Sequence, residues 1–295
     1  MTWFRRSTDA VTPGERPRRG DDGIRPLTTA VALLILPFLA VASVLLYLLP
    51  AETDRLFAWT IAPPLTAMVL GSAYIGGIWF FAQVLRHRVW HRVKLGFPAV
   101  LLFATLLGVA TALHWDRFHP GHISFITWVT LYATTPFLVL AVLIVNRQAD
   151  AGRPDAVDTV LSWPARIALA AVGAASLVAG ATLFVVPAIV VGSWAWEVTP
   201  LTTRVIGAVL TLPGAVNLWL LADARWSAFR ILCQAQIVSL IFLILGVVIC
   251  RDQLEWSAAI TAPFVGLLVV SLVAYTLTYV ACERRARRET VGQAL

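Results

Sequence analysis

The chain has 295 residues, of which 59% are hydrophobic and only 13% are charged. Soluble domains are about 45–50% apolar and about 25% charged, so this composition excludes a water-soluble globular domain and a disordered chain. Three cysteines in a chain of this length also exclude a disulfide-stabilised scaffold. The class that remains is an integral membrane protein with several spans.

Eight apolar segments are each long enough to cross a bilayer core of about 30 Å as a helix. In chain order they cover residues 27–50, 60–85, 95–114, 123–145, 167–192, 204–222, 229–250 and 258–281. Residues 1–26 are polar and rich in Arg, Pro and Gly, which predicts a disordered basic arm. Residues 146–166 form a polar linker, and residues 283–295 form a basic tail. The sequence therefore predicts an all-α, polytopic membrane helix bundle with eight transmembrane helices.

The distribution of basic residues predicts how these spans are oriented. If eight spans cross in alternating directions, 19 of the 23 Lys and Arg residues fall on one side. Cytoplasmic segments carry the excess of Lys and Arg in membrane proteins, so we expect both termini in the cytoplasm and the bundle in the cell membrane. Basic residues at those helix ends would attract anionic lipids at the cytoplasmic face. The same placement argues against nucleic acid as a partner, although the net charge is +7.

Many of the 12 Trp residues fall near predicted span ends, a position typical of interfacial anchors. We expect eight of them in the two aromatic belts of the membrane, namely Trp59, Trp115, Trp194, Trp196 and Trp256 on the outer side and Trp90, Trp163 and Trp226 on the inner side.

An internal duplication is predicted when the chain is aligned with itself so that Pro64 meets Pro200, a shift here called the repeat offset. The tripeptide Pro-Leu-Thr at 64–66 then meets its copy at 200–202, and Trp90 aligns with Trp226. Over residues 64–116 the repeat offset gives ten identities in 53 positions without a gap. The sequence therefore predicts two four-helix repeats, residues 27–145 and 167–282. Because each repeat has an even number of spans, the two would run in the same direction through the membrane.

The Pro-Leu-Thr entry to a helix, followed by Gly and later by an Arg-Trp dipeptide, resembles a pattern in uncharacterised, actinobacterial-type multi-pass membrane proteins. The resemblance covers residues 199–226 best. It is weaker over residues 63–90, where Met68 stands at the position of Arg204. It implies a multi-pass architecture and no particular activity. The large excess of Arg over Lys is typical of a GC-rich bacterial genome.

Every Asp, Glu, Lys and Arg can be placed in a connector, a tail or the terminal turn of a span. Ionisable residues inside the membrane mark proton relays, ion pathways and voltage sensors. Their absence argues against a proton-coupled carrier, a pump or a voltage-gated channel. The sequence favours a carrier or binder of an uncharged or lipid-like small molecule. The alternative is a non-catalytic subunit or assembly partner of a membrane complex, whose spans only pack.

A candidate ligand site lies in the second and sixth spans, where helix-weakening residues occur at matching depth. Gly76-Gly77 aligns with Leu212-Pro213, which Gly214 follows. Interrupted helices at matching positions point to the binding site of a transporter, whereas the simpler interpretation is close helix packing and a Pro kink. With nearby polar groups, the candidate ligand-binding residues are Ser72, Tyr74, Gly76, Gly77, Thr211, Pro213, Gly214 and Asn217.

A weaker hypothesis concerns the connector between the third and fourth spans. It contains His114, Asp116, His119 and His122, whose imidazole and carboxylate groups are possible ligands of zinc or copper in an outward-facing metal-dependent enzyme. The matching connector of the second repeat has no His. The chain has no nucleophile elbow, phosphate-binding loop or Cys-x-x-Cys motif. The sequence therefore predicts no catalytic residue and no cofactor, and it favours a protein that is not an enzyme.

Overall fold

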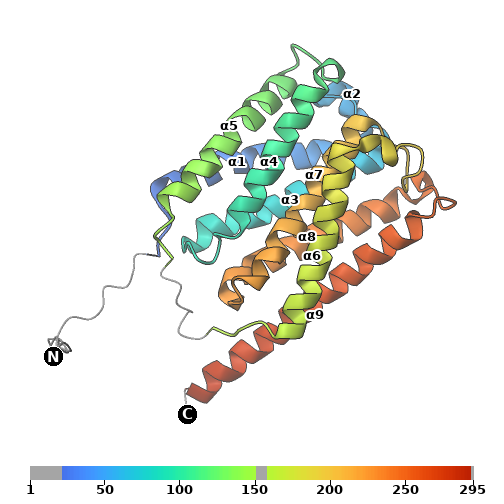
Figure 1. The fold of residues 1–295 in the computed structure, drawn as a ribbon. Helices are drawn as coiled ribbons and strands as arrows, with labels where there is room; N and C mark the ends of the chain where they lie inside the picture. Colours follow the sequence, from blue (N-terminus) through green and yellow to red (C-terminus); the bar gives the residue numbers. More distant parts are fainter. Residues whose placement is uncertain (1–21, 151–157, 294–295) are drawn as a thin grey trace, which may run out of the picture.

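The structure is a computed structural model that describes residues 22–150 and 158–293 (Figure 1). Most of the predicted basic arm, residues 1–21, lies outside the described residues. So do residues 151–157 of the predicted linker and the last two residues of the predicted tail.

Eight helices in the described part of the chain are long and apolar enough to cross a membrane. They are α1 (Pro26–Ser43, extended by a π-helical turn at Val44–Leu48), α3 (Pro64–His87), α4 (Gly96–Leu113), α5 (Ile123–Val145), α6 (Trp163–Val185), α7 (Pro200–Leu218, extended by a 3₁₀ turn at Trp219–Leu221), α8 (Trp226–Ile249) and α9 (Thr261–Gln293). The connectors hold the short helix α2 (Thr53–Leu56) and further single 3₁₀ turns. The chain is therefore an all-α polytopic membrane bundle, as the sequence predicted.

Proline and capping residues set the ends of several spans. α3 and α7 each begin with Pro in the first helical turn. Backbone N–H groups there have no partner within the helix, so Pro, which lacks this group, costs no hydrogen bond. Thr199 caps α7 by accepting from the backbone N–H of Thr202. The predicted span 167–192 is wrong at both ends, because α6 begins at Trp163 and ends at Val185. Pro187 follows two residues later and cannot continue the helix.

Residues 22–26 are ordered, which corrects the prediction that the disordered arm extends through residue 26. Gly23 forms a β-bridge with Val89, and α1 begins at Pro26. The backbone N–H of Ile24 donates to the carbonyl of Arg88 at 3.1 Å. These bonds satisfy backbone groups that would otherwise have no partner, so the segment is fixed against the α3–α4 connector.

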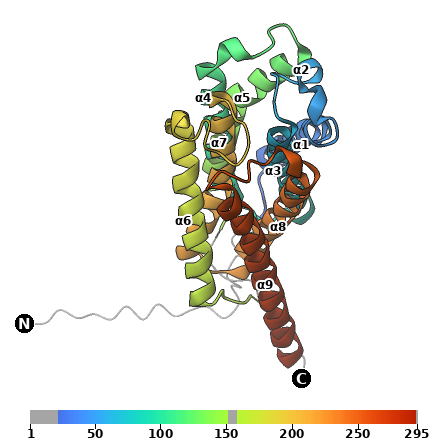
Figure 2. The same cartoon turned by 90° about the vertical axis from the view of Figure 1, so that its right-hand side faces the viewer.

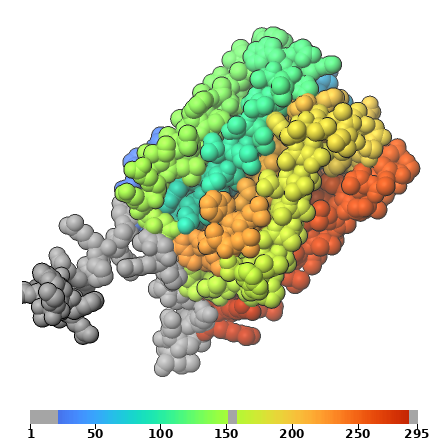
Figure 3. Space-filling view, viewed as in Figure 1, coloured from blue at the N-terminus to red at the C-terminus, as the bar shows by residue number. Residues whose placement is uncertain are grey.

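The long helices of the two halves pack in the same pattern. In this comparison α1 corresponds to α6, α3 to α7, α4 to α8 and α5 to α9. α1 packs on α3 as α6 packs on α7, and α3 packs on α8 as α7 packs on α4. α4 packs on α5 as α8 packs on α9, and α3 and α7 meet at the centre. Figure 3 shows α4 and α5 of the first half lying beside α6 and α7 of the second half on one face. The two halves are thus interlocked through α3, α4, α7 and α8.

Four of the eight predicted interfacial Trp residues lie inside the protein, so their assignment to the aromatic belts is wrong. Trp59, Trp90, Trp196 and Trp226 are each at most 4% exposed. Trp196 illustrates the reason, because its indole N–H donates to the Thr66 hydroxyl at 2.8 Å and so joins the α6–α7 connector to the first turn of α3. Of the eight, Trp115, Trp163 and Trp256 are exposed.

Candidate functional site

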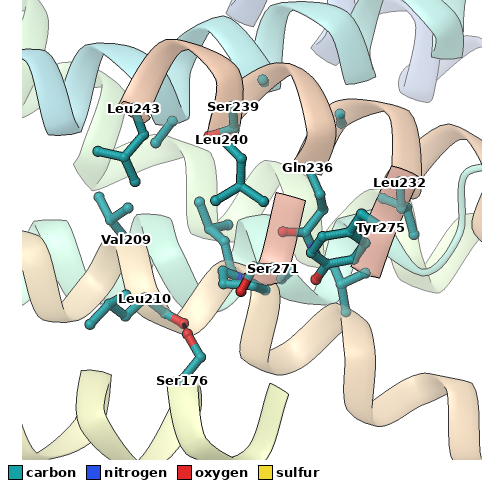
Figure 4. A pocket seen from close by; sticks show the side chains of 18 of the residues that line it. Ser176, Val209, Leu210, Leu232, Gln236, Ser239, Leu240, Leu243, Ser271 and Tyr275 are labelled. Carbon is teal, nitrogen blue, oxygen red and sulfur yellow. Dashed lines mark hydrogen bonds between the residues drawn. The ribbon is translucent and has the colours of Figure 1, made fainter. Parts of the chain in front are cut away.

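A cavity of about 180 Å³, here called the bundle cavity, lies among α3, α4, α6, α7, α8 and α9 (Figure 4). Among the described residues, no Asp, Glu, Lys, Arg or His side chain lines it. Its polar lining residues are Ser176, Gln236, Ser239, Ser271 and Tyr275. An apolar cavity of about 150 Å³ stays dry and accepts benzene, so the bundle cavity has room for a ring or a short segment of an aliphatic chain.

Three of the eight predicted ligand-binding residues border the bundle cavity: Gly76, Gly77 and Pro213. They lie near the middle of α3 and α7. Both helices are continuous through these positions, so the expected interruption of the two spans is wrong. The residues of the sequence pattern border the cavity because they lie where helices pack together, and not because they break the helices.

Glycine is required at the α3–α8 contact beside the cavity. A Cβ atom added to Gly76 would lie 2.9 Å from both the carbonyl oxygen of Ala235 and the Cβ of Ser239. A Cβ added to Gly214 would lie 2.7 Å from the Cβ of Leu177 on α6. Both glycines therefore allow helices to approach closely, and Gly214 does not line the cavity.

The other predicted ligand-binding residues do not line the bundle cavity. The Ser72 hydroxyl donates to the carbonyl of Val69 on its own helix at 2.7 Å. Thr211 does the same toward its own helix, at 2.7 Å from the carbonyl of Ala208. The Tyr74 hydroxyl is buried against that of another Tyr residue on α5. These groups are hydrogen-bonded within the protein and face away from the cavity.

Asn217 contributes to the cavity indirectly, through a residue that the sequence analysis did not single out. Its side-chain Nδ2 donates to the Tyr275 hydroxyl at 2.5 Å, and Tyr275 lines the cavity. Gln236 is the second polar residue that was missed, and Figure 4 shows it pointing toward Tyr275. A glutamine in the middle of an apolar span is the signal that would have identified this wall.

The four predicted metal ligands face different partners. The His114 Nε2 accepts from the Arg204 guanidinium at 2.7 Å, and His119 lies 3.3 Å from the Thr60 hydroxyl. Asp116 is exposed and pairs with its neighbour Arg117. Within residues 22–150 and 158–293, no three His, Cys, Asp or Glu side chains gather in a group able to hold a metal ion. His122 precedes α5 and bonds a serine in the first turn of that helix, and the metal hypothesis gains no support from this geometry.

The basic end of the bundle, where α3 and α7 end and α4 and α8 begin, contains a largely buried ion network. Lys94 pairs with Asp150 at 2.5 Å and with Asp223 at 3.1 Å, and Arg225 pairs with both aspartates at 2.7 Å. Burial would raise the pKa of Asp223, but hydrogen bonds from Arg225 and Lys94 lower it to about 2. The network joins the α3–α4 connector to the α7–α8 connector.

No protein-family model, curated protein or solved structure matches this chain. Its function has therefore to be inferred from the bundle cavity and from the contacts around it.

Proposed function

We propose that this protein binds, and as a carrier exchanges, an uncharged or lipid-like small molecule in the bundle cavity. The observation that carries the proposal is an uncharged, mostly apolar cavity beside Gly76 and Pro213, near the middle of two spans. A charged ligand would leave water without any opposite charge in the cavity wall to compensate it, which is costly. An apolar ligand gains about 25 cal/mol for each Å² that it removes from water.

The bundle cavity adjoins the lipid-facing surface between α6 and α9. Its lining includes Ser176 on α6 and Leu267 on α9, and Leu267 is 47% exposed. Figure 2 shows α6 and α9 diverging toward the end of the bundle where the chain terminates. We propose that a molecule dissolved in the bilayer enters between these two helices.

We further propose that the two halves are repeats of one four-helix unit. The exchange symmetry of the helix packing supports this, and so do hydrogen bonds between connectors. The backbone N–H of His119 donates to the carbonyl of Ala58 at 2.9 Å, and that of Glu255 donates to the carbonyl of Ala195 at 2.8 Å. His119 and Glu255 are matched by the repeat offset found in the sequence.

We propose that the basic end faces the cytoplasm, in the cell membrane of a bacterium. The excess of Lys and Arg at one end supports this orientation. A second cavity of about 460 Å³ at that end is lined by Arg86, Arg92 and Arg230 together with Asp158 and Glu283. Its arginines favour the head groups of anionic lipids as partners of this face.

Native mass spectrometry of the protein released from lipid nanodiscs tests the proposed binding. We expect the wild type to retain a neutral molecule of defined mass and the Leu268→Tyr variant, which fills the bundle cavity, to lose it. The matched control is Leu277→Tyr on the same helix, because Leu277 is 65% exposed and does not line the cavity. It should retain the molecule.

Equal retention by the wild type and both variants would reject binding in the bundle cavity. A stoichiometric protein neighbour in the spectrum, with no small molecule bound, would favour the alternative of a membrane-complex subunit.

A further inference from the structure

The bundle cavity is lined by both halves but extends only into the second half. Its lining includes pairs of positions matched by the repeat offset, namely Ala73 and Val209, Gly76 and Leu212, Gly77 and Pro213, Phe80 and Val216, Gly96 and Leu232, Ala99 and Ala235, and Val100 and Gln236. All the remaining lining residues come from α6, α7, α8 and α9. The two halves therefore differ in what they offer a ligand.

The first half has no matching extension because aromatic side chains occupy that space. Tyr74 and Tyr132 are buried with their hydroxyl oxygens 2.5 Å apart. The ring of Phe103 packs edge-on at centroid distances of 6.3 Å from Tyr74 and 6.5 Å from Tyr132. Their counterparts at the repeat offset are Leu210, Ser239 and Leu268, which are smaller and all line the bundle cavity.

The register of this comparison is supported by packing at the opposite end of the bundle from the ion network. Trp59 packs on Trp128 of α5 with ring centroids 4.7 Å apart, and Trp196, one residue beyond the position that the repeat offset matches with Trp59, packs on Phe264 of α9 at 5.4 Å. The repeat offset matches Trp128 with Phe264, so α5 and α9 correspond in this register. Tyr132 thus corresponds to Leu268, one helical turn further along.

The polar groups of the cavity wall are also specific to the second half. Gln236 and Tyr275 line the cavity, and their counterparts in the first half are Val100 and Val139. Asn217, which donates to Tyr275, corresponds to Phe81. The second half therefore combines empty space with an amide and a phenol.

The Gln236 amide and the Tyr275 hydroxyl each have a hydrogen-bond donor available for a ligand. The Gln236 Nε2 is buried and has no hydrogen-bond partner among the described residues. The Tyr275 hydroxyl accepts from the Asn217 Nδ2 and makes no other hydrogen bond within the described residues, while the Asn217 Oδ1 is buried without a partner. Buried donors without acceptors are costly, so a ligand with an acceptor oxygen would relieve this cost.

We propose that the second-half extension of the bundle cavity recognises a neutral membrane lipid through a carbonyl oxygen. This inference rests on the proposed function and specifies its ligand class. A carbonyl oxygen has two lone pairs and carries no charge, so it matches two donors, Gln236 and Tyr275, in an uncharged wall. The apolar part of the molecule lies along Leu210 and Leu268 and continues into the bilayer between α6 and α9.

Two membrane components share this chemistry, the ring carbonyl of an isoprenoid quinone and the ester carbonyl of a neutral glyceride. A single ring is compatible with the cavity volume of about 180 Å³. A glyceride would place one ester group and a few methylenes there.

Photolabelling of the full-length protein in nanodiscs tests the proposal. The probes are a long-chain methyl ester and a hydrocarbon of equal length, each carrying a diazirine on the chain. We expect the ester to label the wild-type α8–α9 wall more strongly than the hydrocarbon. Gln236→Val should lower ester labelling about two- to tenfold, as for loss of one neutral hydrogen bond, and leave hydrocarbon labelling unchanged.

The matched control is Gln234→Val on the same helix, whose side chain bonds Trp79 and Tyr279 and does not line the bundle cavity. It should preserve the preference for the ester. Equal labelling by both probes in the wild type would overturn the carbonyl proposal while leaving the cavity as a binding site. If neither probe labels the wild type, the proposed function is overturned as well.

Competition with unlabelled lipids shows whether the bound carbonyl group belongs to a quinone or to a glyceride. Unlabelled ubiquinone-2, which has a single quinone ring, or dioctanoylglycerol should suppress ester labelling in the wild type, and the stronger competitor identifies the class. Stronger suppression by the anionic lipid phosphatidylglycerol than by either neutral lipid would overturn the inference.

Discussion

Asp22 and Asp158 are matched by the repeat offset and make the same contact. The Asp22 carboxylate accepts from the backbone N–H of His91 at 3.0 Å, and the Asp158 carboxylate accepts from that of Ser227 at 2.9 Å. His91 and Ser227 are themselves a matched pair at the same offset. An aspartate that precedes the first helix of each half thereby holds the α3–α4 connector in the first half and the first turn of α8 in the second.

Removing either aspartate should destabilise the protein. We expect Asp22→Ala and Asp158→Ala each to lower the free energy of unfolding by about 1–3 kcal/mol, because each leaves a backbone donor without its charged acceptor. Denaturant titration followed by Trp fluorescence in detergent measures this change. Asp252→Ala is the control, since that side chain is 93% exposed, and it should change stability by less than about 0.5 kcal/mol.

Replacement of Gly76 by Ala should destabilise the bundle, because the new methyl group would meet the backbone of α8 at 2.9 Å. We expect a loss of about 1–3 kcal/mol, typical of overpacking. Gly266→Ala on α9 is the matched control, because nothing lies within 4 Å of its added Cβ. Thermal melting in detergent should show a lower Tm for the first variant only, and equal Tm values would contradict the close-packing role of Gly76.

Acid should weaken the ion network at the basic end. The pKa of Asp223 is lowered from 3.8 to about 2, so folding holds the carboxylate in its charged form. Its contribution to stability is complete above about pH 4 and is lost as the pH falls toward 2. Melting curves between pH 6 and pH 2 should show this decline, and Asp223→Asn should flatten it. An unchanged decline in the variant would assign the acid sensitivity to other carboxylates.

Two matched contacts between the halves, at the end opposite the ion network, use different chemistry. Arg204 donates to His114 at 2.7 Å, whereas the matched residues Met68 and Cys250 meet through their sulfur atoms at 3.6 Å. The pKa of His114 is lowered by burial and by the neighbouring Arg204. The folded state therefore favours neutral His114, which can accept the hydrogen bond.

Stability from this contact should be present above about pH 6.5 and decrease as His114 gains a proton below that pH. We expect the double variant His114→Cys with Arg204→Met, which copies the apolar pair of Cys250 and Met68, to remove this dependence. Melting temperatures of both proteins at pH 7.5 and pH 5 provide the test. An identical pH dependence in the wild type and the double variant would show that His114 is not responsible.

The number of spans could be predicted from sequence, because it depends on local composition. An apolar run of about 20 residues specifies a span, and the pair Gly76-Gly77 opposite Pro213 marked the helices that border the cavity. Composition does not tell whether a residue near a span end faces lipid or protein. Trp59 and Trp196 were therefore assigned to the interface, although both are only 2% exposed.

The cavity wall itself could not be predicted, because it depends on pairs of residues far apart in the chain. Tyr74 and Tyr132 fill space together, and neither sequence position shows that the other is close. The comparison that identifies Leu210 and Leu268 as smaller counterparts needs the helix packing as well as the repeat offset. The role of Asn217 was likewise visible only once Tyr275 was placed beside it.

The ion pair between Lys94 and Asp223 restricts the ways in which this protein can work. Alternating access by rocking would tilt one half against the other and separate these residues, which belong to different halves and lie 3.1 Å apart. Arg225 and Asp150 also belong to different halves and pair at 2.7 Å, so such a cycle would have to break both ion pairs at that end on every turnover. Parting of α6 from α9 leaves both pairs intact. We therefore expect the carrier to exchange its ligand laterally with one membrane leaflet, and not by release into water on alternate sides.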